Sequence, residues 1–436
     1  MKNLSKRPPG AIAAYRQVDF PKSTHTTKNS PNDDGLSLEW PLVIFVLGVP
    51  IVALVSLFWV PVYRETIILM VLYGFLRGLS VTTGKKIPPY KTNNPDKYIH
   101  IGYHRLWAHK SYSAHWTLKL VLAIIGAGAG EGAIKTWCRD HRAHHRYVDT
   151  DQDPYSVQKG FFHAHIGWII FKKERNTLGA TATGRVDISD LKSDPIVEWQ
   201  RRYYWQLLLL MAYVLPSVVC GLCWGDFLGG FVLAGCLGTS GVQQSTFCIN
   251  SLAHWMGSQP YQTTKSPRDN LLTAVLTLGE GYHNFHHEFP IDYRNGYRWY
   301  HFDPTKWVIW LCSQLGFASD LRKFPNNEIE KGRVQRKQES LSKECEKLDW
   351  GLPLAELPSM QWEEFQQQAR TGCNLLVING FVYDVSEFVT IHPGGASMLT
   401  AAIGKDATKM FEGDVYGHSN AARNLLDTMR LAVIST

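Results

Sequence analysis

The chain lacks a cysteine framework, an apolar leader and a strong charge of either sign. Its eight cysteines are scattered along 436 residues, and the single CxxC pair, Cys220 and Cys223, lies inside an apolar run. This pattern excludes a disulfide-stapled domain and favours a reducing compartment. The first 35 residues contain no apolar segment that could form a signal-peptide core. The net charge of +7 is small and spread out, so we expect no nucleic-acid partner, although it suits an anionic membrane surface.

What the chain does contain is four long apolar runs. A helix crosses a bilayer with about 20 apolar residues, and the first run has 23 residues without a charge. The runs form two pairs, and a short polar break separates the two members of each pair, Arg64-Glu65 in the first and Asp226 in the second. This arrangement predicts two helical hairpins. Core helices of a soluble protein are the alternative, but turns this short disfavour them. The four predicted transmembrane helices are Pro41–Tyr63, Thr66–Gly84 (interrupted by Arg77), Tyr203–Gly225 and Phe227–Leu252.

The N-terminal arm sets the orientation of these helices. Residues 1–40 are expected to be disordered, and their six basic residues place them in the cytosol by the positive-inside rule. Because each hairpin returns the chain to its starting side, both termini and the intervening loops are predicted to be cytosolic. A shorter apolar segment, Leu118–Gly130, is predicted to be a buried or interfacial helix.

Histidines are concentrated in the predicted cytosolic loops. Two HxxHH triplets and one HxxxxH pair account for eight of the 17 histidines, and the triplet spacing places three rings on one helix face. Imidazole binds iron, copper and zinc, and eight rings exceed the needs of one ion, so two metal ions are predicted. The eight are His104, His109, His141, His144, His145, His283, His286 and His287. The isolated histidines are expected to be ordinary surface or core residues, namely His25, His100, His115, His163, His165 and His301.

The stretches GYHRLWAH, DHRAHHR and GYHNFHH resemble the three histidine boxes of membrane acyl-CoA desaturases of the stearoyl-CoA (delta-9) type, the fungal enzymes in particular. The resemblance extends over residues 41–324 and implies a di-iron centre with nine histidine ligands. The ninth is His254, in the stretch NSLAH, whose Asn250 holds an iron-bound water in that family. The implied ligands are His104, His109, His141, His144, His145, His254, His283, His286 and His287.

The same resemblance implies a reaction and a substrate. It implies oxygen-dependent desaturation of palmitoyl- or stearoyl-CoA at the delta-9 position, with no catalytic residue beyond the metal centre and with dioxygen as co-substrate. Trp137 and Thr246 match the pair that shapes a bent acyl tunnel in the family. Four residues match its contacts to the CoA head group, namely Arg139, Asp140, Lys172 and Lys173.

The end of the chain has a different composition. Residues 325–351 are highly charged and read as a helical linker, and residues 352–436 resemble a cytochrome b5 domain through the stretch HPGG and a later histidine. The resemblance implies haem b with His392 and His418 as axial ligands. It also implies electron supply to the metal centre, with NADH-cytochrome b5 reductase as the upstream partner.

Together these predictions define a fold and a cellular location. We expect an all-α integral membrane domain over residues 41–324, with four transmembrane helices and a cytosolic histidine-rich cap. A small α+β haem domain follows the linker. The protein is predicted to be a multi-pass protein of the endoplasmic reticulum membrane, with the lipid bilayer, acyl-CoA and the reductase as its partners.

One segment departs from the family pattern. Residues Lys85–Gly102 separate SVTTG from YHRLWAH, and removing these 18 residues restores an ungapped match. We interpret the segment as a translated intron of 54 nucleotides, or alternatively as a loop of this lineage. Because it alters the spacing before His104, a chain inactive at the di-iron site and working only as a haem electron carrier is one alternative. A related desaturase or hydroxylase with another position or substrate is a second alternative.

Overall fold

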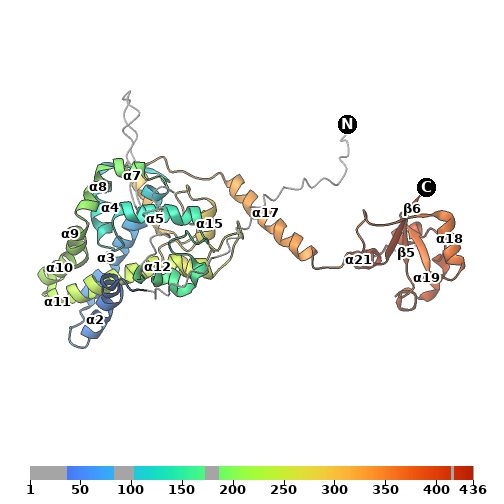
Figure 1. The fold of residues 1–436 in the computed structure, drawn as a ribbon, viewed down its shortest axis with the longest axis horizontal. Helices are drawn as coiled ribbons and strands as arrows, with labels where there is room; N and C mark the ends of the chain where they lie inside the picture. Colours follow the sequence, from blue (N-terminus) through green and yellow to red (C-terminus); the bar gives the residue numbers. More distant parts are fainter. Residues whose placement is uncertain (1–36, 83–102, 172–185, 414–416, 436) are drawn as a thin grey trace, which may run out of the picture.

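The described part of the chain forms a helical body and a small mixed domain, joined by one long helix, α17 (Asn326–Cys345) (Figure 1). The structure is a computed structural model that describes residues 37–82, 103–171, 186–413 and 417–435. The segment Lys85–Gly102 and two predicted substrate contacts, Lys172 and Lys173, lie outside these residues.

The helical body is built from short and long helices interrupted by π-helical turns. In chain order its elements are α1 (Trp40–Val43), η1 (Ile44–Gly48), α2 (Val49–Ser56), α3 (Arg64–Thr82), η2 (Tyr103–Ala108), β1 (Ser113–Ala114), α4 (Trp116–Ala127), α5 (Ile134–Tyr147), η3 (Val157–Lys159), η4 (His163–Gly167), α6 (Trp168–Ile170), α7 (Ser189–Ser193), α8 (Pro195–Arg202), α9 (Tyr204–Leu208), η6 (Leu209–Val214), α10 (Leu215–Trp224), α11 (Phe227–Gly229), η7 (Gly230–Leu237), α12 (Gly238–Asn250), α13 (Leu252–Trp255), α14 (Leu271–Leu276), α15 (His283–Glu288), α16 (Pro304–Gln314) and β2 (Ala318–Ser319).

Helices form in both predicted pairs, and α2 and α3 of the first pair each pack against η7 of the second pair. The second turns at Gly225, which adopts a left-handed φ of 81°, and at Asp226, whose carboxylate accepts a hydrogen bond from the Gly229 amide at 2.9 Å. Thr66 Oγ1, at the start of α3, donates to Asp226 Oδ2 at 2.5 Å. The turn of one hairpin is therefore bonded to the first turn of the other, which holds the two hairpins side by side.

The membrane-crossing prediction is supported for one segment. Among the residues described, Tyr204–Trp224 (21 residues) is the one helix whose length and apolar composition suit a crossing. The first run is helical only as far as Ser56, ahead of Pro61, which cannot continue a helix. In the second run, Arg77 is fully buried and donates to Thr239 Oγ1 at 2.7 Å.

Both hairpins nevertheless carry large exposed apolar side chains. Phe58 and Trp59 are 84% and 76% exposed, and Trp205 and Leu222 are 71% and 76% exposed. Apolar patches of this extent on a monomer mark an interaction surface.

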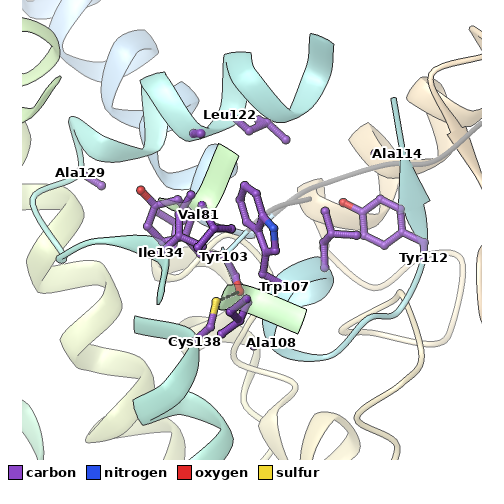
Figure 2. Packing of buried hydrophobic residues seen from close by; sticks show 14 of the residues in the cluster. Val81, Tyr103, Trp107, Ala108, Tyr112, Ala114, Leu122, Ala129, Ile134 and Cys138 are labelled. Carbon is purple, nitrogen blue, oxygen red and sulfur yellow. Dashed lines mark hydrogen bonds between the residues drawn. The ribbon is translucent and has the colours of Figure 1, made fainter. Parts of the chain in front are cut away.

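The core that supports the histidine boxes lies between α4, α5 and η2. Trp107 lies between Tyr103 and Tyr112, and the Cys138 thiol donates to the Tyr103 carbonyl at 3.0 Å (Figure 2). A buried ion pair between Lys119 and Asp194 joins α4 to α8 at 2.6 Å. Because these aromatic residues are almost fully buried, η2 and its histidine are held rigidly against α5.

The C-terminal domain combines a four-stranded sheet with short helices. The sheet order is β3-β6-β5-β4, with β3 and β6 parallel and the other pairs antiparallel. Strands β4 and β5 are joined by Asn379 and Gly380, both at positive φ, as a two-residue hairpin turn requires. Its elements are β3 (Ser359–Gln361), α18 (Trp362–Arg370), β4 (Leu375–Ile378), β5 (Phe381–Asp384), η8 (Val389–Ile391), α19 (Ala396–Ala402), α20 (Thr408–Glu412), α21 (Asn420–Thr428) and β6 (Arg430–Ser435).

Candidate metal centre and haem pocket

Nine histidines from four helical elements converge in two adjacent groups. Within each group the ligand atoms all lie within 4.8 Å of one another. The rings come from η2 and the residue after it, α5, α13 and α15. The first group is His104, His109, His141, His145 and His286, and the second is His144, His254, His283 and His287. All nine predicted ligands are therefore brought together, including His104 after the undescribed segment.

The spacing of the ring nitrogens fits metal coordination. The Nε2–Nε2 distances are 3.0 Å for His104 and His286, and 3.1 Å for both His254 and His287 from His283. With metal–nitrogen bonds of about 2.1 Å, neighbouring ligands lie about 3.0 Å apart at right angles and about 3.4 Å apart at the tetrahedral angle. The measured separations correspond to edges of such a polyhedron, so the donor set fits two metal ions.

Burial keeps the rings in the form that binds metal. It lowers the pKa of eight of the nine histidines well below the usual range, and neighbouring rings and arginines lower it further. Such residues are neutral near pH 7 and present a lone pair to a metal. The eight are His104, His109, His141, His145, His254, His283, His286 and His287.

Carboxylates orient two of the ligands. His104 Nδ1 lies 2.8 Å from Glu280 Oε1, and His144 Nδ1 lies 2.9 Å from Asp153 Oδ1. A hydrogen bond at Nδ1 fixes the tautomer in which Nε2 binds metal. Burial raises the pKa of Glu280 to about 7, although nearby Arg105 opposes the shift.

A hydroxyl orients a third ligand. Ser266 Oγ lies 2.7 Å from His254 Nδ1 and itself donates to Asp149 Oδ1 at 2.5 Å. None of these hydrogen-bond partners was predicted from the sequence. Asp149 and Asp153 follow the second histidine box, and Glu280 precedes the third. An acidic residue beside a box was therefore the sequence feature that could have indicated a hydrogen-bond partner of a ligand.

Replacing Asp153 with asparagine should weaken metal retention. The change preserves the shape of the side chain but removes the negative charge that faces His144 Nδ1. In the parent protein, Asp153 Oδ2 also accepts a hydrogen bond from the Asp149 backbone N–H at 3.1 Å, and an amide NH2 group in that place could not accept it. We expect iron affinity to fall by about tenfold or more, measured as non-haem iron retained after dialysis against a ferrous chelator. Asp151→Asn is the matched control, because that carboxylate is exposed two residues away. Equal retention in both variants would contradict the assigned role of Asp153.

A cavity of ≈ 470 Å³ extends from the histidines into apolar surroundings. The predicted pair Trp137 and Thr246 lines it, and one carboxyl joins them: Glu131 accepts from Trp137 Nε1 at 3.1 Å and from Thr246 Oγ1 at 2.5 Å. Trp137 also stacks on His141, with centroids 4.9 Å apart. Burial raises the pKa of Glu131 to about 7. The apolar part of the lining includes Leu42, Phe45, Val46, Leu208, Val242 and Phe247.

The other predicted substrate and water contacts are partly located. Asn250, at the end of α12, lines this cavity together with His144 and His283. Asp140 also lines it, whereas Arg139 is not among the lining residues and instead pairs with Asp140 at 2.7 Å.

The C-terminal domain holds a second cavity, of ≈ 610 Å³, lined by His392, His418 and apolar side chains. His418 Nδ1 lies 2.9 Å from the Phe411 carbonyl, and His392 Nδ1 lies 3.3 Å from the Gly395 carbonyl. These contacts favour Nε2 as the metal-binding atom. A Cβ on Gly394 would lie 2.8 Å from the His392 ring, so the glycine makes room for this imidazole. Two such histidines in an apolar pocket fit a haem.

Comparison with known proteins divides the chain in the same way. Residues 97–315 match the fatty acid desaturase family, and residues 361–435 match the cytochrome b5-like haem/steroid binding domain. A probable acyl-CoA desaturase of Schizosaccharomyces pombe is 46% identical over 397 residues, covering 91% of this chain and 78% of the relative. Acyl-CoA desaturase 1 of Saccharomyces cerevisiae is 43% identical over 404 residues, covering 91% and 74%. Stearoyl-CoA desaturase 5 of Homo sapiens is 36% identical over 297 residues, covering 67% and 84%.

Proposed function

We propose that this chain, which belongs to the fatty acid desaturase family and carries a C-terminal cytochrome b5 domain, introduces a double bond into palmitoyl- or stearoyl-CoA. The double bond would form at the delta-9 position. The observation that carries this proposal is the pair of buried histidine groups beside an apolar cavity. Imidazole suits iron, and an apolar cavity suits an alkyl chain.

The nine histidines would hold two irons through Nε2, with Asn250 bound to a water at the centre. Bound iron would supply the oxygen activation that removing hydrogen from an unactivated methylene requires. Per double bond, one hydrogen leaves each of two adjacent methylenes, and dioxygen becomes two waters with two electrons and two protons from outside. The chain's own residues confine the alkyl chain and exclude water, and we assign its bend to Trp137 and Thr246, tied together by Glu131.

The head-group contacts are part of the proposal. Arg139, Lys172 and Lys173 would neutralise phosphate groups of CoA, since lysine and arginine pair well with phosphate. Asp140 lines the cavity and would accept a hydrogen bond from the same end of the substrate.

We assign the protein to the endoplasmic reticulum membrane, with four crossings and both termini in the cytosol. The exposed apolar side chains of the two hairpins support contact with lipid. The haem domain would deliver electrons received from NADH-cytochrome b5 reductase, and its covalent tether raises its effective concentration at the desaturase domain.

Expression in a yeast lacking its own delta-9 desaturase tests the proposal. Gas chromatography–mass spectrometry should reveal new palmitoleic and oleic acid, and hydroxy or other unsaturated products would instead indicate a related hydroxylase or desaturase.

The same assay decides the role of Lys85–Gly102. The placement of His104 within the first histidine group leads us to expect product from the chain as written, and also from a variant without these 18 residues. Product from the shortened chain alone would identify the segment as a translated intron that inactivates the di-iron site. A transcript reading directly from Gly84 to Tyr103 would identify it independently.

A further inference from the structure

An aromatic series leads from an exposed tryptophan toward a histidine of the metal centre. Trp299 is 86% exposed and Tyr300 59% exposed, and their ring centroids lie 5.7 Å apart. Tyr300 lies 5.2 Å from His301, which stacks on Tyr282 at 4.4 Å with an interplanar angle of 8°. Tyr282 is covalently joined to His283, a member of the second histidine group.

We infer that Trp299 and Tyr300 form the surface on which the haem domain of the same chain docks, and that its electrons enter the desaturase domain there. This inference rests on the proposed function. One electron at a time leaves the haem and reaches the histidine centre, twice per double bond, and no covalent bond forms or breaks along the way. Closely packed rings shorten the gaps through space that an electron must cross.

The inner part of the series is held in place by packing. A Cβ on Gly296 would lie 2.5 Å from the His301 Cβ. Only glycine at this position therefore leaves enough space for the His301 side chain. Tyr282 is 8% exposed. Rings fixed in this way keep a constant separation, whereas Trp299 and Tyr300 remain open to a partner.

The tether begins beside this surface. Ile329 of α17 is fully buried against Phe285 and Phe289, next to α15 (Figure 1). Tyr297 donates to Glu330 at 2.8 Å, and Arg298 lies 3.9 Å from the same carboxylate. Helix α17 therefore leaves the desaturase domain within two residues of Trp299.

The tether is short enough for the haem domain to contact the surface at Trp299, near the start of α17. Helix α17 has 20 residues, which corresponds to about 30 Å. Gly351 already packs on the Asp427 backbone of the haem domain, so the residues between helix and domain are few and keep the domain close to α17. A domain of this size is about 30 Å across. Folded back along α17, it would cover the surface at Trp299.

The two surfaces complement each other in charge and polarity. Residues 352–436 contain nine acidic and five basic residues, a net −4, whereas the rest of the chain carries +11. Arg322 and Lys323 are exposed, and the Arg322 carbonyl accepts a hydrogen bond from the Tyr293 amide. Tyr293 precedes Trp299 by six residues. At the haem pocket, Ile391 and Met398 belong to the lining and are exposed, and exposed Glu387 precedes Ile391 by four positions in the sequence. Both parts therefore expose apolar side chains, and they carry opposite net charge, which are features that complementary protein interfaces use.

The charge of the neighbouring residues favours this partner over lipid. Arg298 precedes Trp299 directly and pairs with a highly charged helix that is mostly exposed to water. A membrane contact is the competing outcome, and position 299 can report on either partner.

Photo-crosslinking of the full chain in lipid nanodiscs tests the docking. With Trp299 replaced by p-benzoylphenylalanine, mass spectrometry should find adducts with the haem domain within residues 388–398. The same replacement at Trp310, which is 54% exposed on α16, is the control and should give no such adducts. Adducts with lipid alone at position 299, or no adducts, would overturn the inference.

Haem reoxidation tests the electron route. After reduction by the reductase, in the presence of substrate and oxygen, Trp299→Ala combined with Tyr300→Ala should slow haem reoxidation by about tenfold, the effect expected of interface hot spots. Haem absorbance and non-haem iron content should remain at wild-type values, and Trp310→Ala should reoxidise at the wild-type rate. An unchanged rate in the double variant would overturn the route. Because crosslinks are read without turnover, an absence of desaturation in the parent chain would refute the proposed function and leave the docking result intact.

Discussion

Replacing His283 with alanine should abolish desaturation while leaving the haem domain loaded. The ring nitrogen lies 3.1 Å from those of both His254 and His287, so its loss removes one of four ligands in the second group. Ligands that act as a unit are individually indispensable, and we expect activity to fall by about 10³-fold or more. Conversion of stearoyl-CoA by the purified protein measures the loss.

A second histidine variant controls for general damage. His115 caps α4 by accepting a hydrogen bond from the Thr117 amide, and asparagine can make the same cap. His115→Asn should retain activity and both kinds of iron. If His283→Ala kept more than a tenth of the parent activity, the second histidine group would not hold a catalytic metal.

Removal of His392, proposed as a haem ligand, should stop turnover for a different reason. His392→Ala leaves the pocket with one of the two histidines that would hold the haem, so haem absorbance should be lost while the non-haem iron stays. Desaturation driven by NADH and the reductase should fall by about 10²-fold or more, since the tethered donor is what provides a high local concentration.

Added soluble cytochrome b5 separates this effect from damage to the desaturase domain. It should restore turnover of His392→Ala in proportion to its concentration, and it should not restore His283→Ala. Full activity of His392→Ala without added donor would show that the fused domain does not supply the electrons.

The histidine centre could be predicted from sequence because local spacing and family resemblance both carry it. The triplets place three rings on one helix face. The family resemblance supplied His254 through the stretch NSLAH, and the comparisons confirm the family. Glu280 flanks the third box, but its partner His104 lies 176 positions away, so the pairing could not be predicted. The contact of Ser266 with His254 depends on how the intervening loop folds. Glu131 was missed for the same reason: it bonds to Thr246, 115 positions away.

The hairpins show where sequence patterns are less informative. Apolar runs predict helices, and helices form in all four, but run length does not fix helix length. Pro61 follows the end of the first helix, and the fourth run is divided among α11, η7 and α12. In the sequence, Arg77 interrupts the second apolar run with a charge. In the fold, its guanidinium also donates a hydrogen bond to the Ala234 carbonyl at 3.1 Å. Only tertiary packing supplies such partners.

We expect one chain to carry both a histidine-bound di-iron centre and the haem that supplies its electrons. Iron and haem analysis of the purified chain as written tests this most directly, because it needs no substrate and no reductase. We predict two non-haem irons for each haem, one for each histidine group. If the purified protein contained haem iron and no other iron, the histidine groups would hold no metal, and the protein would act only as a tethered electron carrier.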